Sequence, residues 1–254
     1  MMFHEAKNRF NWWLKQKLTW SASVHKRLAM SFDHIFRDLP AFAQRRTNEL
    51  MAKYEITNWP MMCSEQQLLI NLYVLDVMDR SIPQRDFSST SLDIGSATWT
   101  YLPALVAFSG GDWLGVEIDA HQRYMDFTTR RGHAMYMMQF YSGSRYHCGS
   151  VLEVEETFGL ITWLLPYVVI DPLHAAGLPA RYYEPRTLLQ HVWQCLRPGG
   201  TLFIINQGQE EAAAQDQLFA ETGIDTAGPV ELTSCYSVFK KQRFAWCVTR
   251  QIKM

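Results

Sequence analysis

The chain has 254 residues, of which 48% are hydrophobic and 19% are charged, so it can bury a full core and its composition excludes intrinsic disorder. Its formal net charge of −1 excludes a general attraction to nucleic acid or to anionic membranes. Five cysteines without a C-x-x-C pair predict free thiols in a reducing compartment. Charged residues near the N-terminus are not typical of a signal peptide, and no apolar run is long enough to span a bilayer, so we expect a cytoplasmic protein.

The first sixty residues differ from the rest of the chain in charge. They carry ten basic and five acidic side chains, a net charge of +5, whereas the remaining residues have a net charge of −6. Basic side chains that cluster would bind RNA phosphates, but these are dispersed among acids along helical patterns. We therefore expect a helical cover that docks beside a ligand cleft and buries its aromatic stripe, with an RNA-facing module as the alternative.

Apolar residues at helical spacing predict several helices before residue 81. Pro40 and the segment 58–60 separate them, and Ser64 with Gln67 forms a capping-box pattern at the start of the last one. Residues 81–90 are expected to form a linker. The predicted apolar faces are Phe10, Trp13, Leu14 and Leu18; then Leu28, Phe32, Ile35, Phe36 and Leu39; then a face within 42–54; and finally Leu68, Leu72 and Leu75.

From about residue 88 the pattern alternates between strands and helices, which predicts an α/β fold with a doubly wound, mostly parallel sheet. Two β-rich runs at 231–238 and 243–250 flank a turn at 239–242 and predict a C-terminal antiparallel hairpin. The expected organisation is an N-terminal helical extension over 1–87 and a sheet domain over 88–254. The predicted strands lie near 90–94, 113–118, 145–148, 158–164 and 201–206, and the helices near 101–109, 120–140, 185–196 and 209–222.

A nucleotide-site pattern spans the first two predicted strands. Asp93 stands two residues before Gly95, and Glu117 follows 22 residues after that glycine, at the end of the next strand. A site for NAD needs further glycines so that the backbone can approach a pyrophosphate, but Ala97 and Trp99 stand in this turn and Asp93 would repel phosphate. A carboxylate here suits a ligand with an ammonium group, and Glu117 can accept hydrogen bonds from two ribose hydroxyls.

An ammonium group and a ribose without phosphate describe S-adenosylmethionine, and here the chain resembles the class I S-adenosylmethionine-dependent methyltransferases. The resemblance covers roughly residues 88–254 in the family's order. It implies a Rossmann-like methyltransferase domain, S-adenosylmethionine as the cofactor, and the terminal hairpin as the family's antiparallel final strand. The segments that carry it are Leu92–Ala97, Leu114–Asp119, Phe158–Trp163 and Leu196–Ile205.

The resemblance also implies roles for residues at the ends of these strands. Asp93 and Gly95 would line the methionine end of the cofactor, Glu117 would hold the ribose, and Ile118 would lie against the adenine. Ser150 stands where the family usually has an acid that contacts the adenine amine. The cofactor-binding set implied in this way is Asp93, Gly95, Ser96, Ala97, Glu117, Ile118, Ser150, Val151, Thr162 and Trp163.

No residue is identified as the catalytic base, and no metal site is expected, because His147 and Cys148 have no partners at ligand spacing. Asp171 and His174 follow the fourth strand in a segment expected to be a loop, and they are candidates for acid–base chemistry. The apolar, aromatic end of this strand, within 162–167, favours a small or partly apolar methyl acceptor. The oligomeric state is not predicted.

Other interpretations stay open. The missing glycines and Ser150 favour a cofactor-binding fold without transfer activity that acts as an interaction module. An RNA methyltransferase that uses the basic N-terminal helices is a second alternative, and Asp93 disfavours a third, an NAD-dependent oxidoreductase. At the level of single residues, Asp93 could cap a turn and Glu117 could be a solvated strand end.

Overall fold

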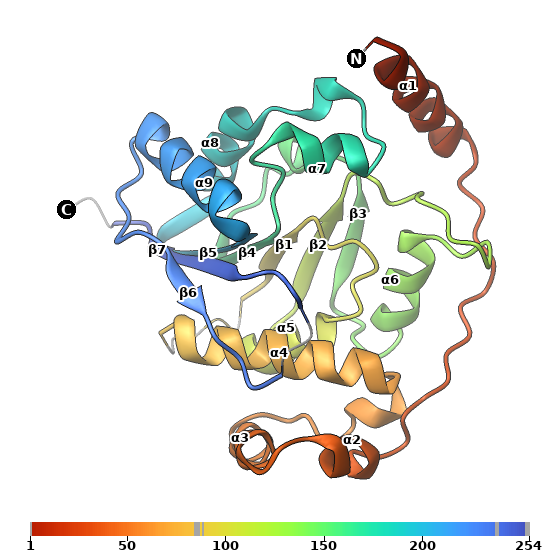
Figure 1. Cartoon of the computed structure of the whole chain (residues 1–254), viewed down its shortest axis with the longest axis vertical. Coiled ribbons are helices and arrows are strands. Elements are labelled where there is room, and N and C mark those ends of the chain that lie inside the picture. The colour runs from red at the N-terminus through yellow and green to blue at the C-terminus, as the bar shows by residue number, and fades with distance from the viewer. Residues whose placement is uncertain (1, 84–86, 88, 237–238, 252–254) are drawn as a thin grey trace.

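The computed structural model describes residues 2–83, 87, 89–236 and 239–251. Within them, seven strands form one sheet in the order β3-β2-β1-β4-β5-β7-β6 (Figure 1). Strands β1 to β5 are parallel, whereas β7 is antiparallel to β5, and β6 is antiparallel to β7. This confirms the predicted mostly parallel sheet with an antiparallel C-terminal pair. The strands are β1 (Ser91–Ile94), β2 (Trp113–Glu117), β3 (Arg145–Cys148), β4 (Phe158–Leu164), β5 (Leu196–Gln207), β6 (Val230–Leu232) and β7 (Arg243–Thr249).

Helices cover both faces of the sheet, each over its own hydrophobic cluster. One cluster joins α4, α5 and α6 to the sheet, and the other joins α8 and α9 to the opposite face. This is the doubly wound arrangement expected from the alternating pattern. The helices are α1 (Met2–Lys17), α2 (Asp33–Asp38), α3 (Ala41–Lys53), α4 (Glu65–Ser81), α5 (Leu102–Ser109), α6 (Arg130–Met138), α7 (Ile170–Ala175), α8 (Pro185–Cys195) and α9 (Gly208–Thr222), with 3-10 turns at Trp59–Met61, Val151–Glu153 and Ala180–Tyr182.

Helix α4 shows how the N-terminal helices are tied to the sheet. The predicted capping box is present, because the Ser64 hydroxyl accepts from the Gln67 N–H and the Gln67 side chain accepts from the Ser64 N–H. Leu72 of α4 and Leu105 of α5 are fully buried in the same cluster. Residues on both sides of position 87 therefore share one core, while the division of the chain into an extension and a sheet domain stays a prediction.

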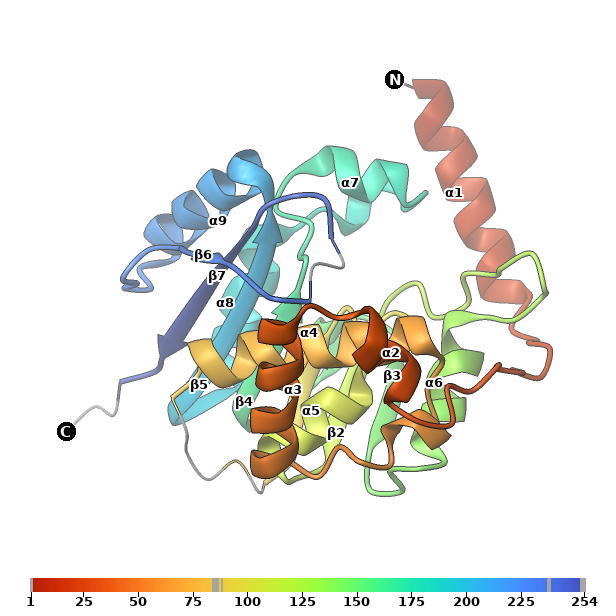
Figure 2. The ribbon, with the colours of Figure 1, turned by 60° about the horizontal axis from the view of Figure 1, so that its bottom comes forward.

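Helix α1 lies apart from the other N-terminal helices. In both views it stands at the end of the sheet where α7 lies, and a long segment past α6 connects it to α2 (Figures 1 and 2). The predicted apolar face was wrong: Phe10 and Trp13 are 61% and 54% exposed, whereas Trp12 is 5% exposed. The helix is apolar on two sides, and the side that carries Trp12 is the one that meets the rest of the protein.

Three other expectations differ from the structure. The helix predicted over 120–140 begins only at Arg130, since Asp126 accepts from the Thr128 N–H and Thr129 caps α6. The helix predicted over 28–39 is limited to Asp33–Asp38. The C-terminal hairpin has a shorter first strand than expected, and residues 237–238 of its predicted run lie outside the described residues. None of the helices in the described ranges has an apolar stretch long enough to cross a bilayer.

Candidate functional site

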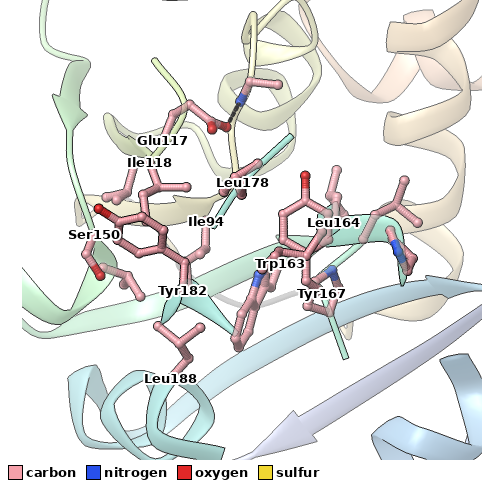
Figure 3. Close-up of a pocket in the computed structure, with 18 of the residues that line it drawn as sticks. Ile94, Glu117, Ile118, Ser150, Trp163, Leu164, Tyr167, Leu178, Tyr182 and Leu188 are labelled. Carbon is pink, nitrogen blue, oxygen red and sulfur yellow. Dashed lines mark hydrogen bonds between the residues drawn. The ribbon is translucent and has the colours of Figure 1, made fainter. Parts of the chain in front are cut away.

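A cavity of about 310 Å³ opens at the carboxyl ends of β1, β2, β4 and β5. Strand β1 lies between β2 and β4, so the chain changes direction across the sheet here, and open α/β sheets bind ligands at such a point. The close-up in Figure 3 shows Glu117, Ile118 and Ser150 on one side of this cavity and Trp163 and Tyr167 on the other.

The loop after β1 adopts left-handed backbone angles although it contains no glycine after Gly95. Gly95, Ala97 and Trp99 all have a positive φ, of 71°, 48° and 50°. Positive φ in a residue other than glycine costs of order 1–3 kcal/mol and persists only where surrounding structure imposes it. Trp99 does not crowd the cavity: it is fully buried, and a Cβ atom on Gly115 would lie 2.8 Å from its ring. Packing against this glycine of β2 therefore holds the loop.

Asp93 is completely buried below this loop. Its two oxygens accept hydrogen bonds from the Thr162 hydroxyl at 2.6 Å and from the Tyr101 hydroxyl at 2.8 Å. Burial raises the pKa of Asp93 to about 7, the charge of Glu117 adds to the rise, and the two hydrogen bonds oppose it. Asp93 does not line the cavity. The expected contact between its carboxylate and a ligand ammonium group therefore has no support from this arrangement, and it stays a prediction.

Glu117 lines the cavity but is only 4% exposed, which excludes the solvated strand end considered above. One carboxylate oxygen accepts from the Ala97 N–H at 2.8 Å, and the other accepts from the Asp119 N–H at 2.7 Å and from the Arg130 guanidinium at 3.0 Å. The carboxylate thus connects the loop after β1 to the end of β2. Sequence reasoning missed Arg130, which also lines the cavity and carries a buried Nε without a hydrogen-bond partner.

The structure brings most of the implied cofactor-binding residues together. Ser150 begins a 3-10 turn, where its hydroxyl accepts from the Leu152 N–H at 3.2 Å. Three of the implied residues, Asp93, Ser96 and Thr162, are fully buried and do not line the cavity. The roles of the whole set toward a cofactor stay predictions. The implied residues that line the cavity are Gly95, Ala97, Glu117, Ile118, Ser150, Val151 and Trp163.

Helix α1 and the segment around α7 pack together beside the cavity. The Trp12 ring packs on Tyr182 with centroids 4.8 Å apart, Asn8 donates to the Leu178 carbonyl, and Lys15 pairs with Asp119 at 3.1 Å. The Tyr182 and Leu178 side chains also line the cavity. Helix α1 thus packs against residues that line the cavity, whereas α2 and α3 pack with α4 away from it, and the role of the N-terminal helices as a cover stays a prediction.

The segment after β4 was expected to be a loop but contains the short helix α7. Pro172 lies in the first turn of this helix, where its missing N–H costs nothing. Pro172 and Leu173 line the cavity, but Asp171 is exposed, and neither it nor His174 lines it. These two candidates for acid–base chemistry are therefore not brought to the cavity. Among the described residues there is no cluster of His, Cys, Asp and Glu that could hold a metal ion.

Known structures of similar fold were found, although no protein-family model and no curated protein matches the chain. An S-adenosylmethionine-dependent methyltransferase from Aquifex aeolicus is 14% identical, with a TM-score of 0.52 over 71% of this chain and 91% of that one. A methyltransferase from Pyrococcus furiosus is 15% identical, with a TM-score of 0.50 over 72% and 83%. A phosphoethanolamine N-methyltransferase from Haemonchus contortus, solved with phosphomonomethylethanolamine and S-adenosylhomocysteine, is 11% identical, with a TM-score of 0.50 over 71% and 52%. The chain therefore has the fold of the class I S-adenosylmethionine-dependent methyltransferases.

Two adjacent tryptophans of α1 allow a matched test of how the helix docks. Trp12→Ala removes the buried ring that packs on Tyr182, so we expect α1 to detach and its amide hydrogens to exchange at least about tenfold faster. Trp13→Ala removes an exposed ring and should leave exchange in α1 and in 178–182 unchanged. Equal protection in the two variants, measured by hydrogen exchange with mass spectrometry, would show that Trp12 does not hold the helix.

Proposed function

We propose that the chain is a methyltransferase that binds S-adenosylmethionine and transfers its methyl group to a small, partly apolar acceptor. The observation that carries this proposal is Glu117, a nearly buried carboxylate that faces a cavity at the switch point of the sheet. The similar fold supports it, and one similar protein, the Haemonchus contortus enzyme, was solved with S-adenosylhomocysteine.

The residues that line the cavity fit this cofactor. The space beside Gly95 is open, since a Cβ atom there would meet nothing within 4 Å, and the φ of 71° lets the backbone pass close to a ligand. Glu117 offers acceptors for the hydroxyls of a ribose. Ile118 and Val151 give an apolar surface for the adenine, beside the Ser150 hydroxyl.

When bound, the cofactor supplies a methyl group already activated on a sulfonium. The task left to the protein is to position the acceptor and exclude water, which is where most of the rate enhancement of such a transfer arises. Glu117 and the loop after β1 fix one end of the cavity, and the apolar wall of Trp163, Leu164 and Tyr167 shapes the other. Tyr182 lines the cavity and packs against Trp12 of α1.

Ligand-induced stabilisation tests the cofactor directly. We expect S-adenosylmethionine or S-adenosylhomocysteine to raise the melting temperature, with about 2.7 kcal/mol of stabilisation at a hundred times the dissociation constant. NAD serves as the control, because the loop after β1 has Ala97 and Trp99 where a pyrophosphate site needs further glycines. Equal or greater stabilisation by NAD would overturn the assignment.

Glu117→Gln tests the carboxylate that carries the proposal. The variant keeps the size of the side chain but loses its charge, so cofactor affinity should fall about ten- to hundredfold, the range for hydrogen bonds to a charged group. Alanine is unsuitable, because it would also remove every hydrogen bond that the side chain accepts from the Ala97 and Asp119 N–H groups and from Arg130. The exposed Glu156→Gln is the control. Calorimetry with S-adenosylhomocysteine measures the effect, and unchanged affinity would remove Glu117 from the binding site.

Internal ion pairs weaken the RNA alternative. Lys15 pairs with Asp119, Arg46 with both Asp76 and Asp79, and Lys53 with Asp79. These side chains belong to the ten basic residues that give the first sixty residues their positive charge. Carboxylates within the protein already neutralise them, so fewer positive charges are available for RNA phosphates.

A further inference from the structure

The strand order divides the cavity into two ends. Apart from Thr162 and Trp163 of β4, the residues implied to bind the cofactor lie in or directly after β1, β2 and β3, whereas β4 and β5 provide the opposite end. Trp163 and Tyr167 form the wall of this second end, and Figure 3 shows them across the cavity from Glu117 and Ser150. Gln207 at the end of β5 and Glu211 in α9 also line this end. The end of the cavity that is left for a methyl acceptor thus has an apolar, aromatic wall and one carboxylate.

Glu211 is a buried carboxylate that no cation neutralises at close range. It lies in the first turn of α9, is 7% exposed, and accepts from the Gln207 N–H at 3.1 Å. Arg243 on the neighbouring strand β7 acts on it electrostatically, but within the described ranges no lysine, arginine or histidine lies within ion-pair distance. Glutamates rarely stay this buried unless they are paired, so the site favours a cation supplied by a ligand.

The cavity's own arginine lies at the other end and is already paired. Arg130 contacts Glu117 at 3.0 Å and Asp119 at 3.9 Å. Arg130 therefore does not pair with Glu211 at the acceptor end. The faces of Trp163 and Tyr167 add to the preference for a ligand cation, because the electron-rich face of an aromatic ring attracts a cation and also packs against an apolar body.

We propose that the methyl acceptor is a small amine with an apolar or aromatic body, and that Glu211 binds its ammonium group and accepts its proton. This inference rests on the proposed methyl transfer. An N–H bond of the ammonium breaks and the proton goes to the Glu211 carboxylate. The freed nitrogen lone pair forms a bond to the methyl carbon, while the carbon–sulfur bond breaks and its electron pair stays on sulfur. The products are a methylated ammonium and S-adenosylhomocysteine, and Glu211 returns its proton to solvent.

Matched probes and matched variants test this inference. The probes are tyramine and 3-phenylpropylamine, compared with 4-ethylphenol and 3-phenylpropionate, which have similar bodies without an amine. Binding to the protein saturated with S-adenosylhomocysteine is measured by calorimetry, and transfer is measured with radiolabelled S-adenosylmethionine. We expect the amines to bind and accept methyl, and the other two probes to do neither.

Glu211→Gln keeps the hydrogen bond to the Gln207 N–H but removes the charge, so amine binding should weaken at least about tenfold while S-adenosylhomocysteine affinity stays unchanged. Glu210→Gln, an exposed carboxylate in the same helical turn, should behave like the unmodified chain. Amine binding that survives Glu211→Gln, or preference for the phenol or the carboxylate, would overturn the amine acceptor. Failure of S-adenosylhomocysteine to bind would instead overturn the proposed function.

Discussion

Replacing Trp99 by alanine is expected to destabilise the protein by about 3–5 kcal/mol, the usual cost of truncating a fully buried tryptophan. The ring is 0% exposed, lies against the backbone of Gly115, and packs at 5.8 Å, centroid to centroid, from Tyr146. Its removal leaves a cavity between the loop after β1 and strand β2. The same change also frees a backbone held at φ 50°, so cofactor affinity should fall together with stability.

Ala97→Gly is the matched control, because it changes the same loop at the other left-handed position without opening a cavity. Glycine adopts the φ of 48° without strain, and its greater freedom in the unfolded chain offsets part of that gain, so stability should change by about 1 kcal/mol or less. Urea unfolding of both variants measures the difference. A loss of stability in Ala97→Gly as large as that in Trp99→Ala would show that the loop depends on restricted backbone freedom and not on the packing of Trp99.

The sequence predicted the elements of the sheet well, because each parallel strand is a short apolar run bounded by turn residues. Leu92 and Ile161 show why: both are fully buried between the two layers of helices, so their strands read as continuous apolar segments. The capping box at Ser64 could be predicted equally well, since it depends only on two residues that are three positions apart.

Features that depend on distant segments could not be read in the same way. Trp12 and Trp13 are neighbours of one type, and only the position of the 178–182 segment decides which of them is buried. Arg130 reaches Glu117 across a loop whose course the sequence pattern did not reveal. Glu211 looks like any acid in the first turn of a helix, and its place at the cavity depends on how α9 follows β5.

Asp93→Asn is expected to remove part of the pH dependence of stability. The pKa of this carboxyl is raised by burial from an ordinary value of 3.8 to about 7. Between these values the folded protein holds a proton that the unfolded chain releases, so stability is fully present below about pH 4. It falls as pH rises toward 7, with a slope of about 1.4 kcal/mol per pH unit. Asparagine carries no charge and resembles the protonated acid in size.

The variant should therefore differ little from the unmodified chain at pH 4, where the folded protein holds the proton and the unfolded chain has released it only in part, and should be more stable than it at pH 8, where the buried carboxylate is ionised. Thr162 and Tyr101 limit this gain in stability. Their hydroxyls stabilise the ionised form of Asp93, whereas the amide of asparagine has a single oxygen to accept from both of them. Urea unfolding at the two pH values measures the effect, with the exposed Asp225→Asn as a control. Parallel pH profiles for Asp93→Asn and the unmodified chain would mean that Asp93 is held as an ordinary carboxylate, and that its hydrogen bonds outweigh its burial.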